Sequence, residues 1–287
     1  MIKFNIPGLW YKKDITIKFL DYCCAHPAEI VENTKVGSVY DSIPYCAWNG
    51  GRIFNTYEQA SKKDVMQLKE IFNEKFNIPI RLIYTNSLLE EKHLSDRFCN
   101  LCLEWLADGP NEVVVANDLL EDYIRTNYPT YKIISSTTKC LTNTNDSGLE
   151  ISKDYYQVCI DYNLNHNQEF LQNIADEDKS KIEFLINAIC PPGCPNRKLH
   201  YHLNGMSALT YQNGFDIECK IQNGINTLNY YKNSIQPEEI HNIYYPMGFT
   251  NFKLEGRTLS DAEVAANYVK YMIKPEYQLK CLSYILR

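Results

Sequence analysis

The sequence predicts an α/β fold, a TIM-type (β/α) barrel of parallel strands in a single domain. Short and almost wholly apolar segments alternate along the chain with segments whose apolar residues recur at helical spacing. Nearly every apolar segment ends in a small polar or charged residue. Continuous apolar strands separated by helices indicate a parallel sheet that helices cover. A length of 287 residues suits one large barrel.

Seven strands can be placed in order along the chain. They cover residues 37–40, 79–84, 112–116, 131–134, 156–160, 182–186 and 251–254. A (β/α) barrel has eight strands, so one more is required. We expect the eighth strand between Leu209 and Ile240, where the apolar pattern is irregular.

Helical patterns fill the intervals between the strands. They cover residues 57–76, 95–106, 118–127, 165–174 and 260–273. The last of these begins at Ser260 and carries Glu263 three positions later, which is the capping-box pattern of a helix N-terminus. Because the chain shows no internal repeat and no linker, we expect one barrel domain over residues 1–287, with a cysteine-bearing insertion at about 188–240.

The composition narrows the classes of partner. A net charge of −6 disfavours nucleic acid, which usually binds a basic face, so a small-molecule substrate is favoured over RNA. No run of 18 apolar residues is present, so we expect no transmembrane helix and no membrane partner. Residues 1–5 lack the apolar run of a signal peptide, and we therefore expect a cytoplasmic protein.

The chain contains eleven cysteines, which is a high number for a cytoplasmic protein. Because the cytosol keeps thiols reduced, we expect no disulfides. Most of the cysteines are expected to pack in the core as small hydrophobic residues. Cys99 and Cys102 lie on a helical stretch beside Phe98 and Leu101, and we interpret both as core residues.

Cys190 and Cys194 form a distinct pair directly after a strand, at a spacing of C-x3-C. Three prolines and Gly193 surround them, and such a rigid turn would let both sulfur atoms face one centre. Cys219 is the natural third thiolate. A radical-SAM motif would need a further cysteine where Arg197 stands, so we exclude it.

Three thiolates suit an iron–sulfur cluster with one open iron, or a zinc site that His200 or His202 completes. Three thiols that bind no metal are the alternative, because C-x3-C spacing by itself is a weak signal.

Two segments resemble the peptidase U-32 (collagenase-like protease) family. Residues 247–258 resemble the family's strand with a glycine followed by K-[IL]-E-G-R. Residues 187–200 are close to the N-x2-C-x3-C-P-x-R-x2-H form of one branch, which has a three-cysteine motif. Residues 233–240 match the same branch's I-x-P-E-[DE]-[IL] segment, so the specific motifs cover only about residues 187–258.

The resemblance implies a barrel with a cysteine-bound 4Fe–4S cluster and an oxygen-independent reaction. The better-studied relatives hydroxylate RNA bases or a quinone precursor. The better-known branch has four cysteines at longer spacing, and only three can be placed here. Either a fourth ligand, such as His200, His202 or Cys46, completes the cluster, or one iron stays open. An open iron would suit a Lewis acid or a sulfur carrier. The sequence contains no recognisable pair of protease nucleophile and base and no HExxH zinc site, so we expect no peptidase activity.

The expected function is therefore hydroxylation, or sulfur or oxygen transfer, on a small molecule or nucleobase, with an electron donor or partner subunit. The alternative is a non-catalytic scaffold subunit of a heteromeric enzyme that carries a cluster or zinc.

Lys253, Glu255 and Arg257 are the first candidates for catalysis. They alternate along one strand, so their side chains are expected to share one face and point into the barrel. They either contact substrate or form a buried ion network that only stabilises the barrel. His200 is a further candidate, which could ligate a metal, move a proton or simply hold its loop.

Polar residues at the strand ends are the candidates for substrate binding, because these ends meet at the mouth of a barrel. The candidates are Asp41, Asn49, Arg52, Asn117, Asp161, Asn187 and Arg197. Arg197 could bind a carboxylate or phosphate through two hydrogen bonds. For each single residue, capping of a helix or turn is the alternative. The ring as a whole favours an enzyme over a scaffold.

Overall fold

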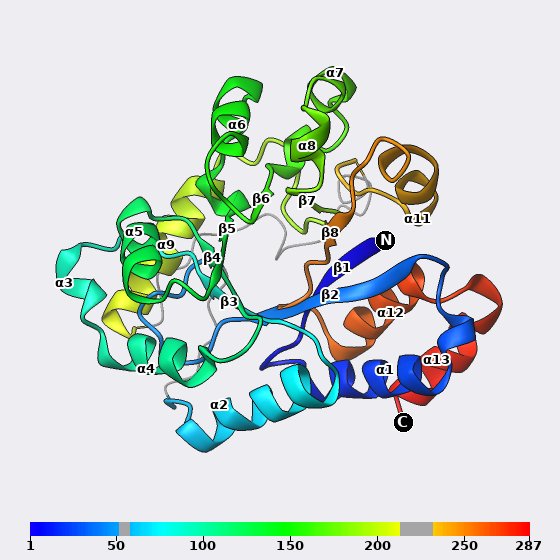
Figure 1. The fold of residues 1–287 in the computed structure, drawn as a ribbon, viewed down its shortest axis with the longest axis horizontal. Helices are drawn as coiled ribbons and strands as arrows, with labels where there is room; N and C mark the ends of the chain where they lie inside the picture. The colour runs from blue at the N-terminus through cyan, green and yellow to red at the C-terminus, as the bar shows by residue number, and fades with distance from the viewer. Residues whose placement is uncertain (52–57, 213–231) are drawn as a thin grey trace.

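The computed structural model describes residues 1–51, 58–212 and 232–287, and it shows a closed barrel of parallel strands (Figure 1). The strands are β1 (Ile2–Pro7), β2 (Thr34–Asp41), β3 (Ile80–Tyr84), β4 (Glu112–Val115), β5 (Lys132–Ser135), β6 (Gln157–Cys159), β7 (Ile182–Leu185) and β8 (Asn251–Lys253). Each strand pairs with the next in sequence, and β8 pairs with β1. The predicted TIM-type barrel is confirmed.

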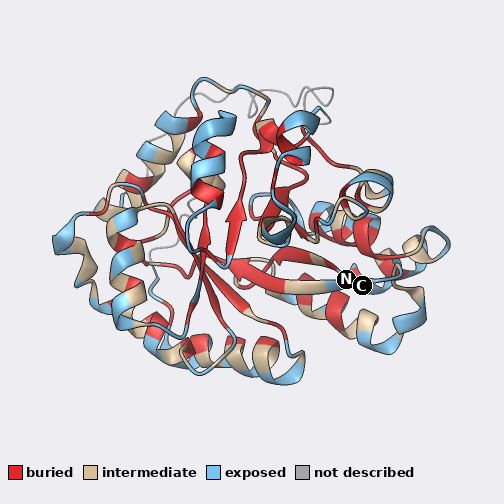
Figure 2. Ribbon diagram, turned by 45° about the horizontal axis from the view of Figure 1, so that its top comes forward, coloured by how far each residue is buried: buried red, intermediate tan, exposed pale blue. Residues whose placement is uncertain are grey.

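Helices surround the strands. They are α1 (Lys13–Ala25), α2 (Lys62–Lys69), α3 (Glu91–Leu94), α4 (Arg97–Leu106), α5 (Asp118–Asn127), α6 (Thr144–Ile151), α7 (Gln168–Gln172), α8 (Asp176–Lys179), α9 (Arg197–Thr210), α11 (Pro237–Glu239), α12 (Asp261–Met272) and α13 (Gln278–Ile285). Figure 2 shows the strands buried over most of their length, whereas the helices expose one side to solvent. Among the described helices, none is long and apolar enough to cross a membrane.

The predicted position of the eighth strand was wrong, because the missing strand is β1 at the N-terminus. Lys3 and Asn5 interrupt its apolar residues, so β1 does not show the continuous apolar run by which the other strands were found. Asn5 is nevertheless buried, because its side chain donates to Glu183 inside the barrel at 2.6 Å. The described parts of the expected region, residues 209–212 and 232–240, contain no strand.

The predicted helices are present, with some changes in extent. The capping box of α12 is confirmed, since Ser260 Oγ accepts from Glu263 N and Glu263 Oε2 accepts from Ser260 N at 2.8 Å. The pattern over residues 57–76 corresponds to α2 followed by a π-helix, η2 (Glu70–Lys75). The pattern over residues 165–174 contains only the short helix α7.

A buried ion network fills the N-terminal half of the barrel interior. Arg81 Nε donates to Glu112 Oε2 at 2.7 Å, and Nη2 donates to Gln157 Oε1 at 2.7 Å. Arg81 Nη1 also donates to Glu183. These four residues occupy the first or second positions of their strands, and together with Asn5 we call them the interior network. Each charge in it has a described partner of opposite charge, as buried charges require.

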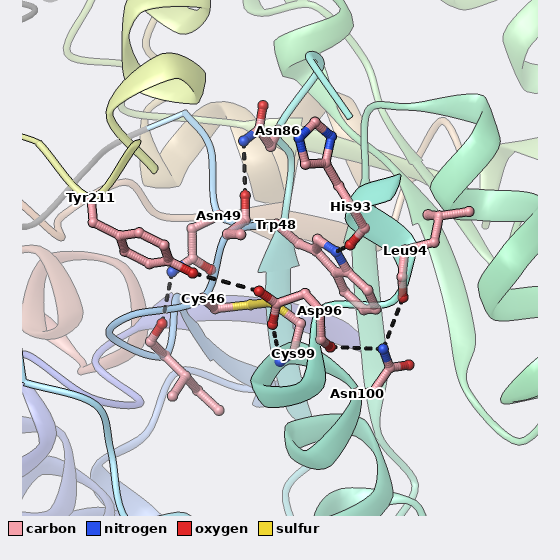
Figure 3. Close-up of a disulfide and its surroundings, with 12 residues drawn as sticks. Cys46, Trp48, Asn49, Asn86, His93, Leu94, Asp96, Cys99, Asn100 and Tyr211 are labelled. Carbon is pink, nitrogen blue, oxygen red and sulfur yellow. Dashed lines mark hydrogen bonds between the residues drawn. A yellow bond between two sulfur atoms is a disulfide. The ribbon is translucent and has the colours of Figure 1, made fainter. Parts of the chain in front are cut away.

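The expectation of no disulfides was wrong, because Cys46 and Cys99 are joined (Figure 3). Cys46 lies in the loop after β2 and Cys99 in the first turn of α4, with Cα atoms 5.4 Å apart, an ordinary separation for a disulfide. The expectation rested on the reducing conditions of the cytosol. Cys46 and Cys99 are 53 residues apart in the sequence, so no local pattern indicates that they pair. Cys46 is therefore not available as a fourth cluster ligand. Cys102 is a buried free thiol, as the core interpretation predicted.

Candidate functional site

A small cavity of about 50 Å³ lies at the carboxyl end of the barrel, and we call it the mouth cavity. Its wall includes Thr85, Tyr162, Cys190, Lys253, Glu255 and Arg257. They come from the ends of β3, β6, β7 and β8 and the segments that follow. In barrels of this type, active sites form at this end of the strands.

Lys253 is the last residue of β8, and it is 8% exposed. Its Nζ lies over the ring of Tyr40, 4.4 Å from the ring centroid. Among the described residues, no carboxylate lies within 4.0 Å of Nζ and no acceptor takes a hydrogen bond from it. Burial lowers the pKa of this amine, although the charges of Glu183 and Cys159 act in the opposite direction. The cavity wall therefore contains a buried amine without a close ionic partner in the described structure.

Glu255 and Arg257 reach the same cavity from the segment after β8. The strand ends at Lys253, so the three residues do not alternate along one strand as predicted, but all three line the cavity. The side chain of Asn187 takes the place of a strand neighbour: its Nδ2 donates to Glu255 O at 2.9 Å, and its Oδ1 accepts from Glu255 N at 2.6 Å. Glu255 Oε2 accepts from Ile189 N at 2.9 Å, and Arg257 Nη1 donates to Ser42 Oγ at 2.9 Å.

Two hydroxyl groups in the cavity wall have no hydrogen-bond partner in the described structure. They are Thr85 Oγ1 and Tyr162 Oη, and their residues are 3% and 1% exposed. Buried hydroxyls usually have a partner, so each such group requires an explanation. Neither residue carries a signal in the sequence: the polar residue selected at the end of β6 was the preceding residue, Asp161, and no residue at the end of β3 was selected.

Cys190 and Cys194 lie in the loop between β7 and α9, and Cys194 is a free thiol. Cys190 is buried and lines the mouth cavity, whereas Cys194 is half-buried. Gly193 between them adopts a φ of +63°, and its N–H donates to Asn163 Oδ1 at 2.9 Å. Glycine is favoured at this left-handed position, as expected for a tight turn.

Cys219, the third predicted ligand, lies outside the described residues. Within the described ranges, no group of three or more His, Cys, Asp or Glu side chains could hold a metal ion. The thiol donors Cys190 and Cys194 are of the kind that a cluster needs, and Cys190 is at the cavity. The three-cysteine site stays a prediction.

Arg197 and Asp161 bind each other rather than facing the cavity as open groups. Arg197 Nη1 is paired with Asp161 Oδ2, and Nη2 donates to Thr137 O at 2.8 Å. Arg197 Nε donates to Tyr201 Oη at 3.1 Å, and the guanidinium lies 4.1 Å from the ring centroid of Tyr162. The donors that sequence analysis assigned to a substrate carboxylate or phosphate therefore contact protein groups, and they anchor α9 to the barrel.

Three more candidates fulfil the capping and turn roles that were the alternative. Asp41 Oδ2 accepts from the backbone of Trp10 and Tyr11 at 3.3 and 3.2 Å, and burial raises its pKa although Arg257 lowers it. Asn117 caps α5 through Leu120 N. Asn49 Nδ2 donates to Ile43 O at 2.7 Å. None of the three candidates lines the mouth cavity.

The remaining candidates are two histidines and one arginine. His200 is half-buried on α9 and is not among the residues that line the mouth cavity, and His202 is exposed. Arg52 lies outside the described residues. Their predicted roles in catalysis, metal binding and substrate binding have no test in the geometry.

A larger cavity of about 510 Å³ lies outside the barrel, between α6, α7 and α8. Asn145, Asn167 and Asn173 contribute to its wall. It contains none of the predicted site residues, and none of the described buried polar atoms without a partner lies on a residue that lines it. Size alone therefore does not make it the better site.

No protein-family profile and no curated protein matches this sequence. This chain is similar to a solved structure, that of the U32 peptidase Mk0906. The match covers 77% of this chain and 85% of the other, with 14% sequence identity and a TM-score of 0.48. A similarity at this level carries no argument about the chemistry of this chain.

Proposed function

We propose that the mouth cavity is the active site of an enzyme that acts on a small molecule, and that Cys190, Cys194 and Cys219 hold a 4Fe–4S cluster at its edge. One observation carries the proposal: Cys190 is buried in the wall of the cavity that Lys253, Glu255 and Arg257 also line. A cluster held through Cys190 would therefore lie beside the charged groups that contact substrate.

The roles of the protein residues follow from their contacts. Lys253 and Arg257 would bind and orient the substrate, and Glu255 would hold or accept a proton. The backbone N–H of Ile189 and the side chain of Asn187 fix the position of Glu255. Buried hydroxyls without described partners favour an enzyme over a scaffold, because a scaffold does not need unpartnered donors around a cavity.

The proposed reaction class is oxygen-independent hydroxylation, or transfer of sulfur or oxygen, as the resemblance of residues 187–200 and 247–258 implies. When bound, the cluster would supply an iron that acts as a Lewis acid or an electron carrier. A cavity of about 50 Å³ and a net charge of −6 favour a small substrate over RNA. A partner subunit or electron donor would complete the system.

The test is a metal analysis of the protein purified without oxygen. We expect about four iron and four sulfide ions per chain, together with a cluster absorption band. The Cys190→Ala variant should lose them, whereas Cys281→Ala, which removes a buried free thiol on α13, should retain them.

Two results would contradict the cluster. One zinc ion per chain without sulfide would replace it with the zinc alternative. No bound metal after reconstitution with iron and sulfide would remove the cofactor from the proposal altogether.

A further inference from the structure

We propose that the mouth cavity binds an anionic group of its substrate, a carboxylate or a phosphate, between Lys253 and Arg257, with the hydroxyls of Thr85 and Tyr162 as additional donors. The inference rests on the proposed function only in taking the mouth cavity as the substrate site. It does not depend on the cluster.

The first argument is the charge of Lys253. A buried ammonium needs a partner, and among the described residues it has only the face of the Tyr40 ring within reach. Glu183 lies below it in the interior network, but at more than 4.0 Å, so it forms no ion pair with Nζ. Its Oε1 accepts from Arg81 and Asn5, and its Oε2 has no hydrogen-bond partner in the described structure. An anion in the cavity would supply the missing partner.

The second argument is the space beside Arg257. Gly51 adopts a φ of +74° and has no side chain, and a Cβ atom there would lie 3.6 Å from Arg257 Nη2 and 3.4 Å from Thr85 Oγ1. The position that a side chain would fill is therefore within contact distance of a guanidinium nitrogen and a hydroxyl. Guanidinium groups bind carboxylates and phosphates with favourable planar geometry.

The third argument is the pair of hydroxyls, Thr85 Oγ1 and Tyr162 Oη, which are buried and have no partner in the described structure. A buried hydroxyl without a partner lowers stability, and an anion would accept a hydrogen bond from each. Among the described residues that line the cavity, Glu255 is the one carboxylate, against two cations, and its Oε2 already accepts from Ile189 N.

The size of the cavity limits the ligand. At about 50 Å³ it is much smaller than the ~300–1,000 Å³ of typical small-molecule pockets. The described cavity therefore takes one anionic head group, and the rest of the substrate would extend toward the mouth.

The test is a calorimetric titration of the full chain, purified without oxygen, with inorganic phosphate and with malonate in separate experiments. Sodium chloride at equal ionic strength is the control for screening. We expect one site with affinity in the millimolar range or better for at least one of the two anions. Phosphate alone would indicate a phosphate-bearing substrate, and malonate alone would indicate a carboxylate-bearing one.

Variants locate the site. Lys253→Met and Arg257→Met should each weaken binding about tenfold or more, since each removes a charge-assisted contact. Lys270→Met is the control, because Lys270 Nζ donates a hydrogen bond to Gln236 Oε1 on the outside of the molecule.

Tyr162→Phe and Thr85→Val keep the test decisive if a charge variant fails to fold. Each removes a hydroxyl with no described partner, so folding should be unaffected while anion affinity falls several-fold. Lack of binding for both anions, or unchanged affinity in all four cavity variants, would overturn the inference and leave Lys253 as a counterion of Glu183. A cluster without anion binding would refute only this inference, and anion binding without a cluster would refute only the proposed cofactor.

Discussion

The interior network and the mouth cavity lie in the same barrel, but they differ in how their cations are paired. Arg81 in the network has two carboxylate partners, although Glu183 Oε2 has no described hydrogen-bond partner, whereas Lys253 in the cavity wall has no described ion pair. In the network, Arg81 meets two carboxylates and an amide, and all of these groups are buried. In the cavity wall, the amine of Lys253 and the hydroxyls of Thr85 and Tyr162 have no hydrogen-bond partner among the described residues. The ion pairs of the network stabilise the fold, whereas we propose that the polar groups of the cavity wall bind a ligand.

Substitutions in the two regions should therefore have different effects on stability. A change in the network leaves a buried charge without a partner and should lower the free energy of unfolding. A change at an unpartnered cavity group removes a cost and should leave the fold intact. Stability measurements can therefore separate the two regions before any substrate is known.

The largest effect is expected for Arg81→Met. This change leaves Glu112 and Glu183 buried without their cation, and it should lower the free energy of unfolding by about 3–5 kcal/mol. Urea denaturation measures the change. Lys253→Met should lower the free energy of unfolding by less than half as much, because it breaks no described ion pair. Equal losses of stability in the two variants would contradict the difference between the network and the cavity.

The next effect concerns the disulfide at the rim. Cys46→Ala opens a covalent loop of 53 residues and should lower the free energy of unfolding by about 2–4 kcal/mol. The Cys23→Ala variant, which removes a half-buried free thiol on α1, is the control. Denatured protein should show two fewer reactive thiols before reduction than after it. Equal thiol counts would show that the pair is not bonded in solution.

A third effect depends on pH. Glu150 accepts from Lys139 at 2.6 Å and from Ser135, and it pairs with Lys153 at 2.7 Å. Burial alone would raise the pKa of Glu150, but these contacts lower it to about 2, below its ordinary value of 4.5. Because the folded pKa is lower than the unfolded one, this stabilisation is present above about pH 4.5 and is lost as the pH falls toward 2.

The effect is measured by comparing the free energy of unfolding at about pH 6, above that window, with its value at about pH 3, within the window. Glu150→Gln should lose about 1–3 kcal/mol of the difference between the two pH values. Glu104→Gln, at an exposed position on α4, should behave as the unmodified protein does. An unchanged pH profile in Glu150→Gln would show that the contacts of this carboxylate do not stabilise the fold.

The smallest effect is the sharpest test of the comparison. Tyr162→Phe should not lower the free energy of unfolding, because its hydroxyl has no described partner and its removal takes away a desolvation cost. Tyr131→Phe is the matched variant, since the buried Tyr131 hydroxyl donates to Leu103 O at 2.7 Å, and it should cost about 1 kcal/mol. Equal costs would mean that Tyr162 has a partner in solution that stabilises the fold.

Much of the fold could be predicted from the sequence, because apolar runs and helical spacing are local signals. β1 was not predicted because Lys3 and Asn5 interrupt its apolar residues. The burial of Asn5 depends on Glu183, which lies 178 residues away in the sequence. The disulfide was also not predicted, because it joins residues distant in the sequence and no local pattern identifies Cys46 as the neighbour of Cys99.

The candidate site could be predicted only in part. The segment with Lys253, Glu255 and Arg257 carries its own signal, and it does line the cavity. Asp161 and Arg197 are chemically suited to binding substrate, but they pair with each other across 36 residues. Thr85 and Tyr162 are ordinary residue types, and what distinguishes them is the lack of a described partner, which is visible only in three dimensions.

The most direct test of the account is a crystal structure of the protein, grown without oxygen in the presence of phosphate or malonate. We predict an anion within hydrogen-bonding distance of Lys253 Nζ and the hydroxyls of Thr85 and Tyr162, with the interior network unchanged. A cavity that contains only water, with Lys253 hydrogen-bonded to Glu183, would contradict the account and place Lys253 in the network.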